Sequence, residues 1–197
     1  MTKTPTSPIS RGPTPPTPAP RLATHTPGAP LSPEHMALMR EWLIDCIPHS
    51  MALNLSLVEM TCGRAVIALP WAAHLVGNAD TGVLAGGAIT ALLDSVCGSA
   101  VASLMVEVVP FATLDLRIDY NRPAEPRQTV IAQAECYRLT PNIAFTRALA
   151  HHGDPAQPVA AASGTFMMST RALPHEPTRV GRGRQDAADS RQAKRSR

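Results

Sequence analysis

The chain has 197 residues and a formal net charge of +3, with 17% charged and 4% aromatic residues. That length suits one domain with a sizeable core. The charge is uneven, because residues 34–170 hold seven Arg and twelve Asp or Glu, a net charge of −5, whereas both ends are basic. A folded part with this balance and so few aromatic rings excludes a basic, stacking surface for nucleic acid.

The two ends of the chain differ from its middle in composition. Residues 1–33 contain ten of the twenty prolines and no acidic residue, and residues 171–197 carry eight Lys or Arg. Neither segment has the apolar content needed to fold, so we expect a disordered proline-rich arm and a disordered basic tail. We interpret the tail as a solvated segment without a function of its own, and the alternative is a weak contact with RNA or anionic lipid. The predicted folded domain is therefore 34–170.

The chain carries four cysteines with no CxxC spacing: Cys46, Cys62, Cys97 and Cys136. We interpret them as reduced core thiols of a cytoplasmic protein, and expect no disulfide frame, metal site or cofactor. The N-terminus lacks the continuous apolar stretch of a signal peptide, although its Ser, Thr and Arg without acids leave an organelle transit peptide open.

The first predicted elements are a helix and a hairpin. An amphipathic helix is expected from Ser32 through about Cys46, closed by Pro48. Residues 53–69 alternate or run apolar on either side of a turn at Cys62-Gly63, which predicts two antiparallel strands.

A polar, glycine-containing turn then leads into an apolar helix that begins at Gly86-Gly87. The first N–H groups of a helix have no partner inside it and suit a developing negative charge, although glycine pairs are also common in purely structural turns. Asp94 lies within the apolar run. A carboxylate there must pair with another group, face a water-filled cleft, or have a raised pKa. A buried acid satisfied by backbone donors is the alternative.

Residues 88–106 are almost uncharged and nearly long enough to cross a bilayer. Asp94 and several serines dilute this stretch, and no Lys or Arg flanks it as an orientation signal. We therefore expect no membrane span.

Four strands are expected after the helix. In residues 113–120, Leu114, Leu116, Ile118 and Tyr120 should face one way, and Asp115, Arg117 and Asp119 the other. Three more strands are expected near 129–139, 142–151 and 159–169, separated by turn residues. One long helix with six strands predicts an α+β fold in which an antiparallel sheet wraps around the helix.

Over about residues 35–170 the chain resembles hotdog-fold acyl-CoA thioesterases of the phenylacetate-pathway, PaaI-like type. The order and spacing of four pieces carry the resemblance: Gly77-Asn78, Gly82-Val83-Leu84-Ala85-Gly86-Gly87, Ala91-Leu92-Leu93-Asp94, and residues 116–124, which read Leu-Arg-Ile-Asp-Tyr-Asn-Arg-Pro-Ala. The resemblance implies the hotdog fold and hydrolysis of an acyl-CoA thioester to a free acid and CoA.

The resemblance also implies which residues act. Asp94 matches the family's general base or nucleophile, the N–H of Gly86 its donor to the thioester carbonyl, Asn78 its turn asparagine and Thr113 a hydroxyl residue that helps to hold the attacking water. Substrate contacts are expected at Gly87, and at Arg122, Arg138 and Arg147 for the CoA phosphates, although each arginine is also explained as an ordinary surface residue.

One position departs from the family pattern: Ala85 stands where the family has His before the glycine pair. A methyl group cannot hydrogen-bond a water or a thioester, so we expect weaker chemistry unless another residue substitutes. His74 is a candidate substitute, or else a solvent-exposed loop residue. Ala85 is also compatible with an alternative function, in which a hotdog protein binds acyl-CoA without hydrolysing it and acts as a ligand sensor or interaction module.

Gly86 and Asp94 are eight residues apart, which is roughly 12 Å along a helix. A base and an oxyanion donor must each lie within about 3 Å of the reacting group or its water. Both can act together only if Asp94 comes from a neighbouring copy, so we expect a homodimer with shared sites, or a dimer of dimers.

Overall fold

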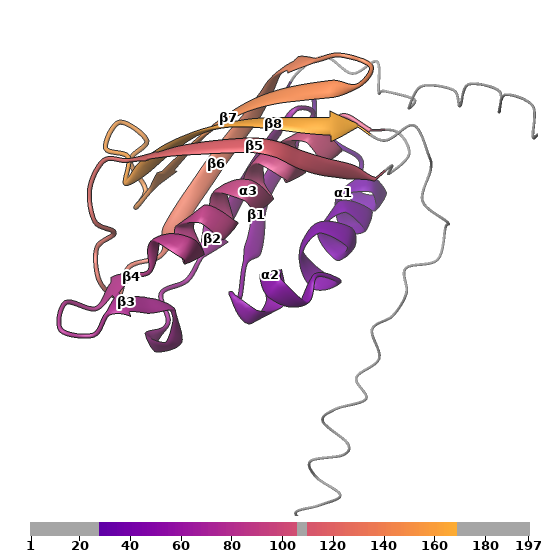
Figure 1. Ribbon diagram of the computed structural model, residues 1–197. Helices are drawn as coiled ribbons and strands as arrows, with labels where there is room; N and C mark the ends of the chain where they lie inside the picture. The colour runs from indigo at the N-terminus through magenta and orange to yellow at the C-terminus, as the bar shows by residue number, and fades with distance from the viewer. Residues whose placement is uncertain (1–27, 106–109, 169–197) are drawn as a thin grey trace, which may run out of the picture.

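The computed structural model describes residues 28–105 and 110–168 (Figure 1). The basic tail and most of the proline-rich arm lie outside these residues. The end of the arm does not: Gly28 N donates a hydrogen bond to the carbonyl of Cys62 over 2.8 Å, and Pro30 pairs with Thr61. Composition alone places residues 28–33 in the arm, because backbone pairing leaves no mark in composition.

Helices and strands follow in the order expected, with some short additions. They are α1 (Pro33–Arg40), a π-helical turn (Glu41–Asp45), α2 (Pro48–Ala52), β1 (Ser56–Thr61), β2 (Arg64–Leu69), a 3-10 turn (Ala73–Leu75), β3 (Val76–Asn78), β4 (Val83–Leu84), α3 (Gly86–Ala102), β5 (Phe111–Tyr120), β6 (Val130–Leu139), β7 (Ile143–His151) and β8 (Ala160–Met168).

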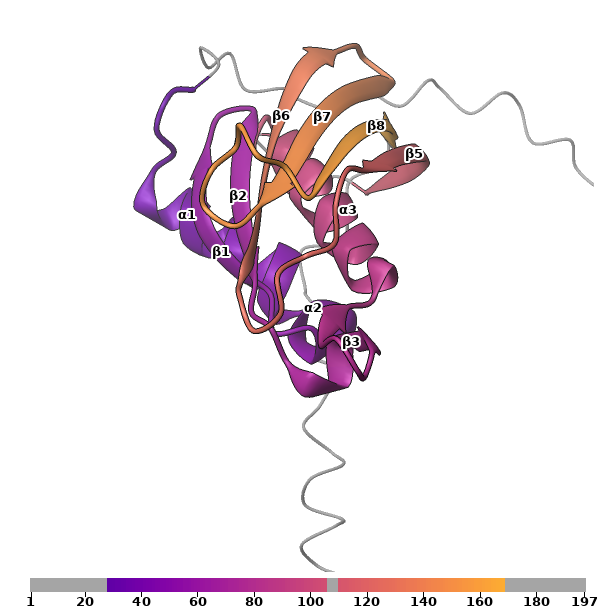
Figure 2. The ribbon, with the colours of Figure 1, turned by 90° about the vertical axis from the view of Figure 1, so that its left-hand side faces the viewer.

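Six strands form one antiparallel sheet in the order β1-β2-β6-β7-β8-β5, and β3 pairs only with β4. The sheet curls around α3, as Figures 1 and 2 show from two sides. Leu92, Leu93 and Val96 on α3 have no exposed surface. The predicted α+β hotdog architecture is confirmed.

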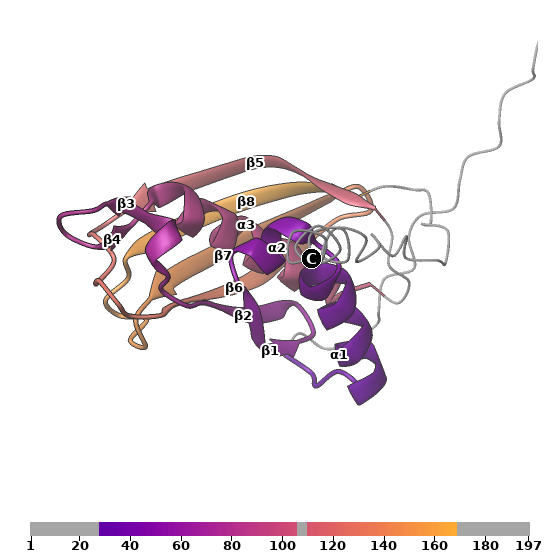
Figure 3. The same cartoon turned by 90° about the horizontal axis from the view of Figure 1, so that it is seen from below.

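The N-terminal helix is shorter than predicted. Ser32 caps it, because its hydroxyl accepts a hydrogen bond from His35 N, but α1 ends at Arg40 and a π-helical turn follows. Pro48 begins α2 instead of closing the first helix, since the first helical position needs no N–H. Both helices lie at the β1 side of the molecule (Figure 3).

The first hairpin turns at Cys62-Gly63 as predicted, with Gly63 at φ 77°. Its first strand begins later than expected, at Ser56. Leu53 and Leu55 precede the strand and are nevertheless buried. The alternation of apolar and polar residues at Leu53 and Leu55 therefore reflects burial of the leucines and not pairing in a strand.

Strand β5 departs from simple alternation at Leu114. Its pairing with β8 shifts between Thr113 and Asp115, so one extra residue bulges out of the ladder. Leu116 and Ile118 pack against the core as predicted, whereas Leu114 is 54% exposed. The bulge turns Thr113 toward α3, on the same side as Leu116.

No helix in the described part of the chain is long and apolar enough to cross a membrane. Residues 28–105 and 110–168 also hold no group of three or more His, Cys, Asp or Glu that could bind a metal ion.

The four cysteines all lie in the described residues, and none of them forms a disulfide. Burial raises the pKa of Cys97 and of Cys136 to about 11, so both thiols are protonated near neutral pH. Neither is therefore suited to act as a nucleophile.

Candidate active site

Asp94 lies in the middle of α3 and is half-buried. Its Oδ1 accepts a hydrogen bond from the hydroxyl of Thr113 on β5, over 2.8 Å. No other residue in the described part of the chain donates to this carboxylate. The donor is thus a side-chain hydroxyl and not a set of backbone amides, and Oδ2 is left available.

The face of α3 that carries Asp94 is the one that the sheet leaves uncovered. Gly86, Gly87 and Thr90 on this face are exposed, and Ala91 and Ser95 are half-buried. Gly86, Thr90 and Asp94 follow one another at four-residue intervals, so they share one side of the helix. Asp94 and Gly86 are nevertheless two helical turns apart, about 12 Å.

Helix α3 begins without a side-chain cap. Ala85 is the N-cap residue, with φ −61° and ψ 136°, and no side chain accepts from the first turn. No described residue accepts a hydrogen bond from the N–H of Gly86 or of Gly87. A Cβ added at Gly87 would meet nothing within 4 Å. Both glycines are exposed, so two amide donors without a described acceptor lie at the surface end of the helix.

Asn78 lies in the turn that packs against this helix start. Its Oδ1 accepts from Asp80 N over 3.0 Å and from Thr81 N over 3.3 Å, which leaves the Nδ2 group without a described partner. A Cβ added at Gly77 would lie 2.8 Å from Ala85 Cα, so β3 approaches the N-cap closely. This contact brings the Asn78 turn beside the start of α3.

Two hydroxyl groups meet at the first turn of α3. Tyr120 Oη donates to the carbonyl of Gly86 over 2.8 Å and lies 2.9 Å from Thr90 Oγ1, which itself donates to the same carbonyl over 3.1 Å. The sequence pattern identified Tyr120 only as a strand residue. Nothing in its spacing indicated a contact with a glycine 34 positions earlier.

The three predicted arginines lie in different places. Arg122 follows Tyr120 by two residues, at the same end of the sheet as Gly86, and bonds Glu125 and the carbonyl of Gln157. Arg138 is near the turn between β6 and β7, at the opposite end. Arg147 is paired with Glu135 on the outer face of the sheet. The fold therefore brings only Arg122 near the start of α3.

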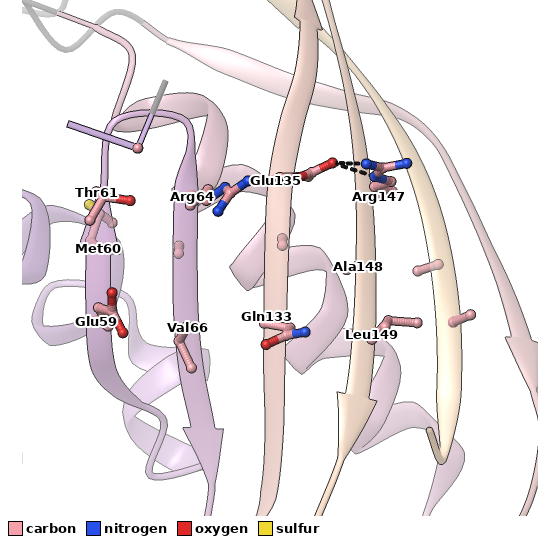
Figure 4. Close-up of a pocket in the computed structure, with 15 residues that line it drawn as sticks. Glu59, Met60, Thr61, Arg64, Val66, Gln133, Glu135, Arg147, Ala148 and Leu149 are labelled. Carbon is pink, nitrogen blue, oxygen red and sulfur yellow. Dashed lines mark hydrogen bonds and ion pairs between the residues drawn. The ribbon is translucent and has the colours of Figure 1, made fainter. Parts of the chain in front are cut away.

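The outer face of the sheet holds a groove of about 730 Å³. Figure 4 shows α3 behind the strands that line it, with Arg64 and Arg147 directed toward Glu135. The groove is thus separated from Asp94 by the sheet itself, and we do not assign it to the candidate site.

A second hollow, of about 660 Å³, lies beside the Asn78 turn and is lined in part by Trp71, Thr81 and Arg127. Arg127 is a cation that sequence reasoning missed, because a single loop arginine carries no pattern. His74, the proposed substitute for the family histidine, instead contacts the carbonyl of Ala52 at 3.3 Å.

Comparison with known proteins identifies the class. A family model of the thioesterase superfamily matches residues 81–159. A solved protein from Pseudomonas aeruginosa is 39% identical, with a TM-score of 0.61, over 66% of this chain and 96% of that one. A mutant of the phenylacetic acid degradation protein PaaI from Thermus thermophilus is 28% identical, with a TM-score of 0.54, over 61% of this chain and 98% of that one.

A second solved protein from Pseudomonas aeruginosa is 30% identical, with a TM-score of 0.59, over 66% of this chain and 98% of that one. No curated protein matches. The chain belongs to the thioesterase superfamily, as a PaaI-like hotdog protein.

Proposed function

We propose that this protein hydrolyses an acyl-CoA thioester to a free carboxylic acid and CoA. The observation that carries the proposal is the hydrogen bond from Thr113 to Asp94 on the uncovered face of α3. It occupies one carboxylate oxygen and leaves the other to act as a base. Membership of the thioesterase superfamily supports the same reaction class.

In the proposed reaction, Asp94 Oδ2 takes a proton from a water molecule while the water oxygen bonds to the thioester carbonyl carbon. The carbonyl oxygen becomes negative and accepts a hydrogen bond from Gly86 N–H, a contribution worth about 10²–10³ in rate in other enzymes. The C–S bond then breaks, and the CoA sulfur leaves with the proton that Asp94 had taken. Asn78 Nδ2 is a further donor to the substrate.

The spacing of Gly86 and Asp94 supports a site shared between two copies. If two α3 helices pack antiparallel with their midpoint near Ala91, the Gly86 end of one meets the Asp94 region of the other, and a two-fold axis generates two equal sites. The small side chains at Gly87, Ala91 and Ser95 permit close approach of the helices. We propose that the active unit is a homodimer or a dimer of dimers built from it.

The decisive experiment measures CoA release, by thiol capture, from short, medium, long and aromatic acyl-CoA substrates. Replacing the general base in Asp94→Asn should lower kcat by about 10²–10⁴-fold. The matched control is Asp119→Asn, whose carboxylate is 61% exposed and paired with Arg117 at the surface, and it should retain the wild-type rate. Equal rates for both variants would contradict the proposal.

The alternative is a hotdog protein that binds acyl-CoA without turnover, and the observation that favours it is the uncapped helix start at Ala85. Under this alternative, calorimetry would detect binding of acyl-CoA while no substrate released CoA, and Asp94→Asn would bind as wild type does. None of the four cysteines forms a disulfide in the described part of the chain, which supports a reducing compartment, and we propose the cytoplasm.

A further inference from the structure

The first turn of α3 has little of its own to hold its geometry. It begins with two glycines, which are among the least favourable residues for a helix because they have the greatest backbone freedom. Its N-cap residue, Ala85, supplies no side-chain hydrogen bond. The amide donors that the proposed reaction needs therefore belong to the residues of the helix with the most flexible backbone.

The Tyr120 hydroxyl compensates for this. It bonds the carbonyl of Gly86 over 2.8 Å and, with the Thr90 hydroxyl 2.9 Å away, forms a three-membered cluster on that one oxygen. The carbonyl of Gly86 and the N–H of Gly87 belong to one planar peptide unit. Fixing the carbonyl therefore fixes the direction of the Gly87 N–H and the position of the adjoining Gly86.

We propose that Tyr120 is a positioning residue for the reaction, and that it holds the Gly86-Gly87 amides toward the thioester carbonyl in a helix start that lacks a side-chain cap. The inference rests on the proposed function. It assigns to strand β5 both supports of the site, since Thr113 orients the acid and Tyr120 orients the donors.

Tyr120 contributes little to the core, because half of its surface is exposed. Removing only its hydroxyl leaves the ring in place and leaves Gly86 O bonded by Thr90. Tyr120→Phe should consequently fold as wild type does. Its matched control is Tyr137→Phe, the other tyrosine of the chain, which is 58% exposed on β6 and lies beside Phe145.

The kinetic test compares these two variants on the best acyl-CoA substrate. Loss of one neutral hydrogen bond should lower kcat of Tyr120→Phe by about 5- to 10-fold with KM within about 2-fold, because the donors act mainly on the developing oxyanion. Thr90→Val should behave similarly and Thr90→Ser should recover the rate. An unchanged kcat in Tyr120→Phe, or an equal loss in Tyr137→Phe, would overturn the proposal.

A second measurement is independent of activity. Amide ¹⁵N relaxation gives order parameters for Gly86 and Gly87, and we expect rigid values near 0.85 in wild type and in Tyr137→Phe, with clearly lower values in Tyr120→Phe. Unchanged values in Tyr120→Phe would overturn the positioning role whatever the rates. If wild type hydrolyses no substrate but the amides loosen as expected, the proposed hydrolysis fails, whereas the finding that Tyr120 holds the Gly86-Gly87 amides stands.

Discussion

The hydroxyl of Thr113 lies 2.8 Å from Oδ1 of Asp94 and joins the edge strand β5 to the middle of α3. A hydroxyl that donates to one carboxylate oxygen sets the direction of the other. The geometry gives Asp94 a fixed orientation on an otherwise apolar helix.

Thr113→Val keeps the shape of the side chain and removes the donor. We expect kcat to fall by about 10-fold, because the carboxylate loses one hydrogen bond and its orientation, and Thr113→Ser should restore most of the rate. Steady-state CoA release measures both. Thr165→Val, on the outward side of β8, is the control and should be neutral. A wild-type kcat in Thr113→Val would show that Thr113 has no role in the reaction.

Gly86→Pro deletes the proposed oxyanion donor with little change of backbone. Proline is favoured at the first helical position, and Ala85 already has the extended ψ of 136° that a residue before proline needs. We expect kcat to fall by about 10²–10³-fold. Gly86→Ala retains the N–H, and its Cβ would lie 3.4 Å from Tyr120 Oη, so it should remain active. Similar rates in the two variants would show that this N–H is not the donor.

Mixing two inactive variants tests whether sites are shared. Asp94→Ala and Gly86→Pro chains, refolded or co-expressed together, should form mixed dimers in which one site has both an intact acid and an intact donor. With random pairing, about a quarter of the wild-type sites should return. CoA release by the mixture, beside each variant alone, gives the answer. No recovery despite proven mixed dimers would exclude a shared site.

Arg122 and Arg147 should differ in their effect on substrate binding. Because Arg122 lies at the same end of the sheet as Gly86, Arg122→Gln should raise KM for acyl-CoA several-fold with kcat nearly unchanged. Arg147→Gln should leave both constants as they are, because Arg147 is tied to Glu135 on the outer face. The reverse pattern would instead indicate that the CoA phosphates bind in the groove on the outer face of the sheet, shown in Figure 4.

His151 makes the fold sensitive to acid. Burial lowers the pKa of its imidazole below the ordinary value, with Asp154 opposing and His152 adding to the shift. The unfolded chain therefore binds a proton at higher pH than the folded chain, so stability is complete above about pH 6.5 and falls as the pH drops below it. Urea unfolding midpoints at pH 7.5 and 5.5 measure the loss.

His151→Asn is the variant that isolates this effect. Its side-chain oxygen can replace His151 Nδ1 as the acceptor for Gly153 N, a bond of 3.0 Å, without a titrating ring. The difference between the two midpoints should shrink in His151→Asn and persist in His74→Asn. An unchanged difference in His151→Asn would assign the acid sensitivity to other groups.

The sequence predicted the sheet well where alternation and turns agree. The strands near 129–139, 142–151 and 159–169 match β6, β7 and β8 to within a residue or so. The bulge at Leu114 could not be predicted from the sequence, because an alternating pattern assumes an unbroken register. The extra residue is defined only by how β5 pairs with β8. The orientation of Thr113 depends on that bulge.

The candidate site was only partly visible in sequence. Asp94 and the glycine pair stand out because an acid and two glycines interrupt an apolar helix. The contact of Tyr120 with Gly86 and the separation of Arg147 from Asp94 follow from how the sheet curls, which determines the side of the sheet each residue occupies. Such relationships have no signature in the local pattern.

Strand β5 carries Thr113 near its start and Tyr120 at its end, and each bonds to a different turn of α3. In a dimer whose sites each take an acid from one copy and donors from the other, one β5 strand serves two sites at once. Substitution of both residues in a single β5 strand is then not confined to one site. It weakens both, so a mixed dimer with one altered β5 should lose activity at its two sites together.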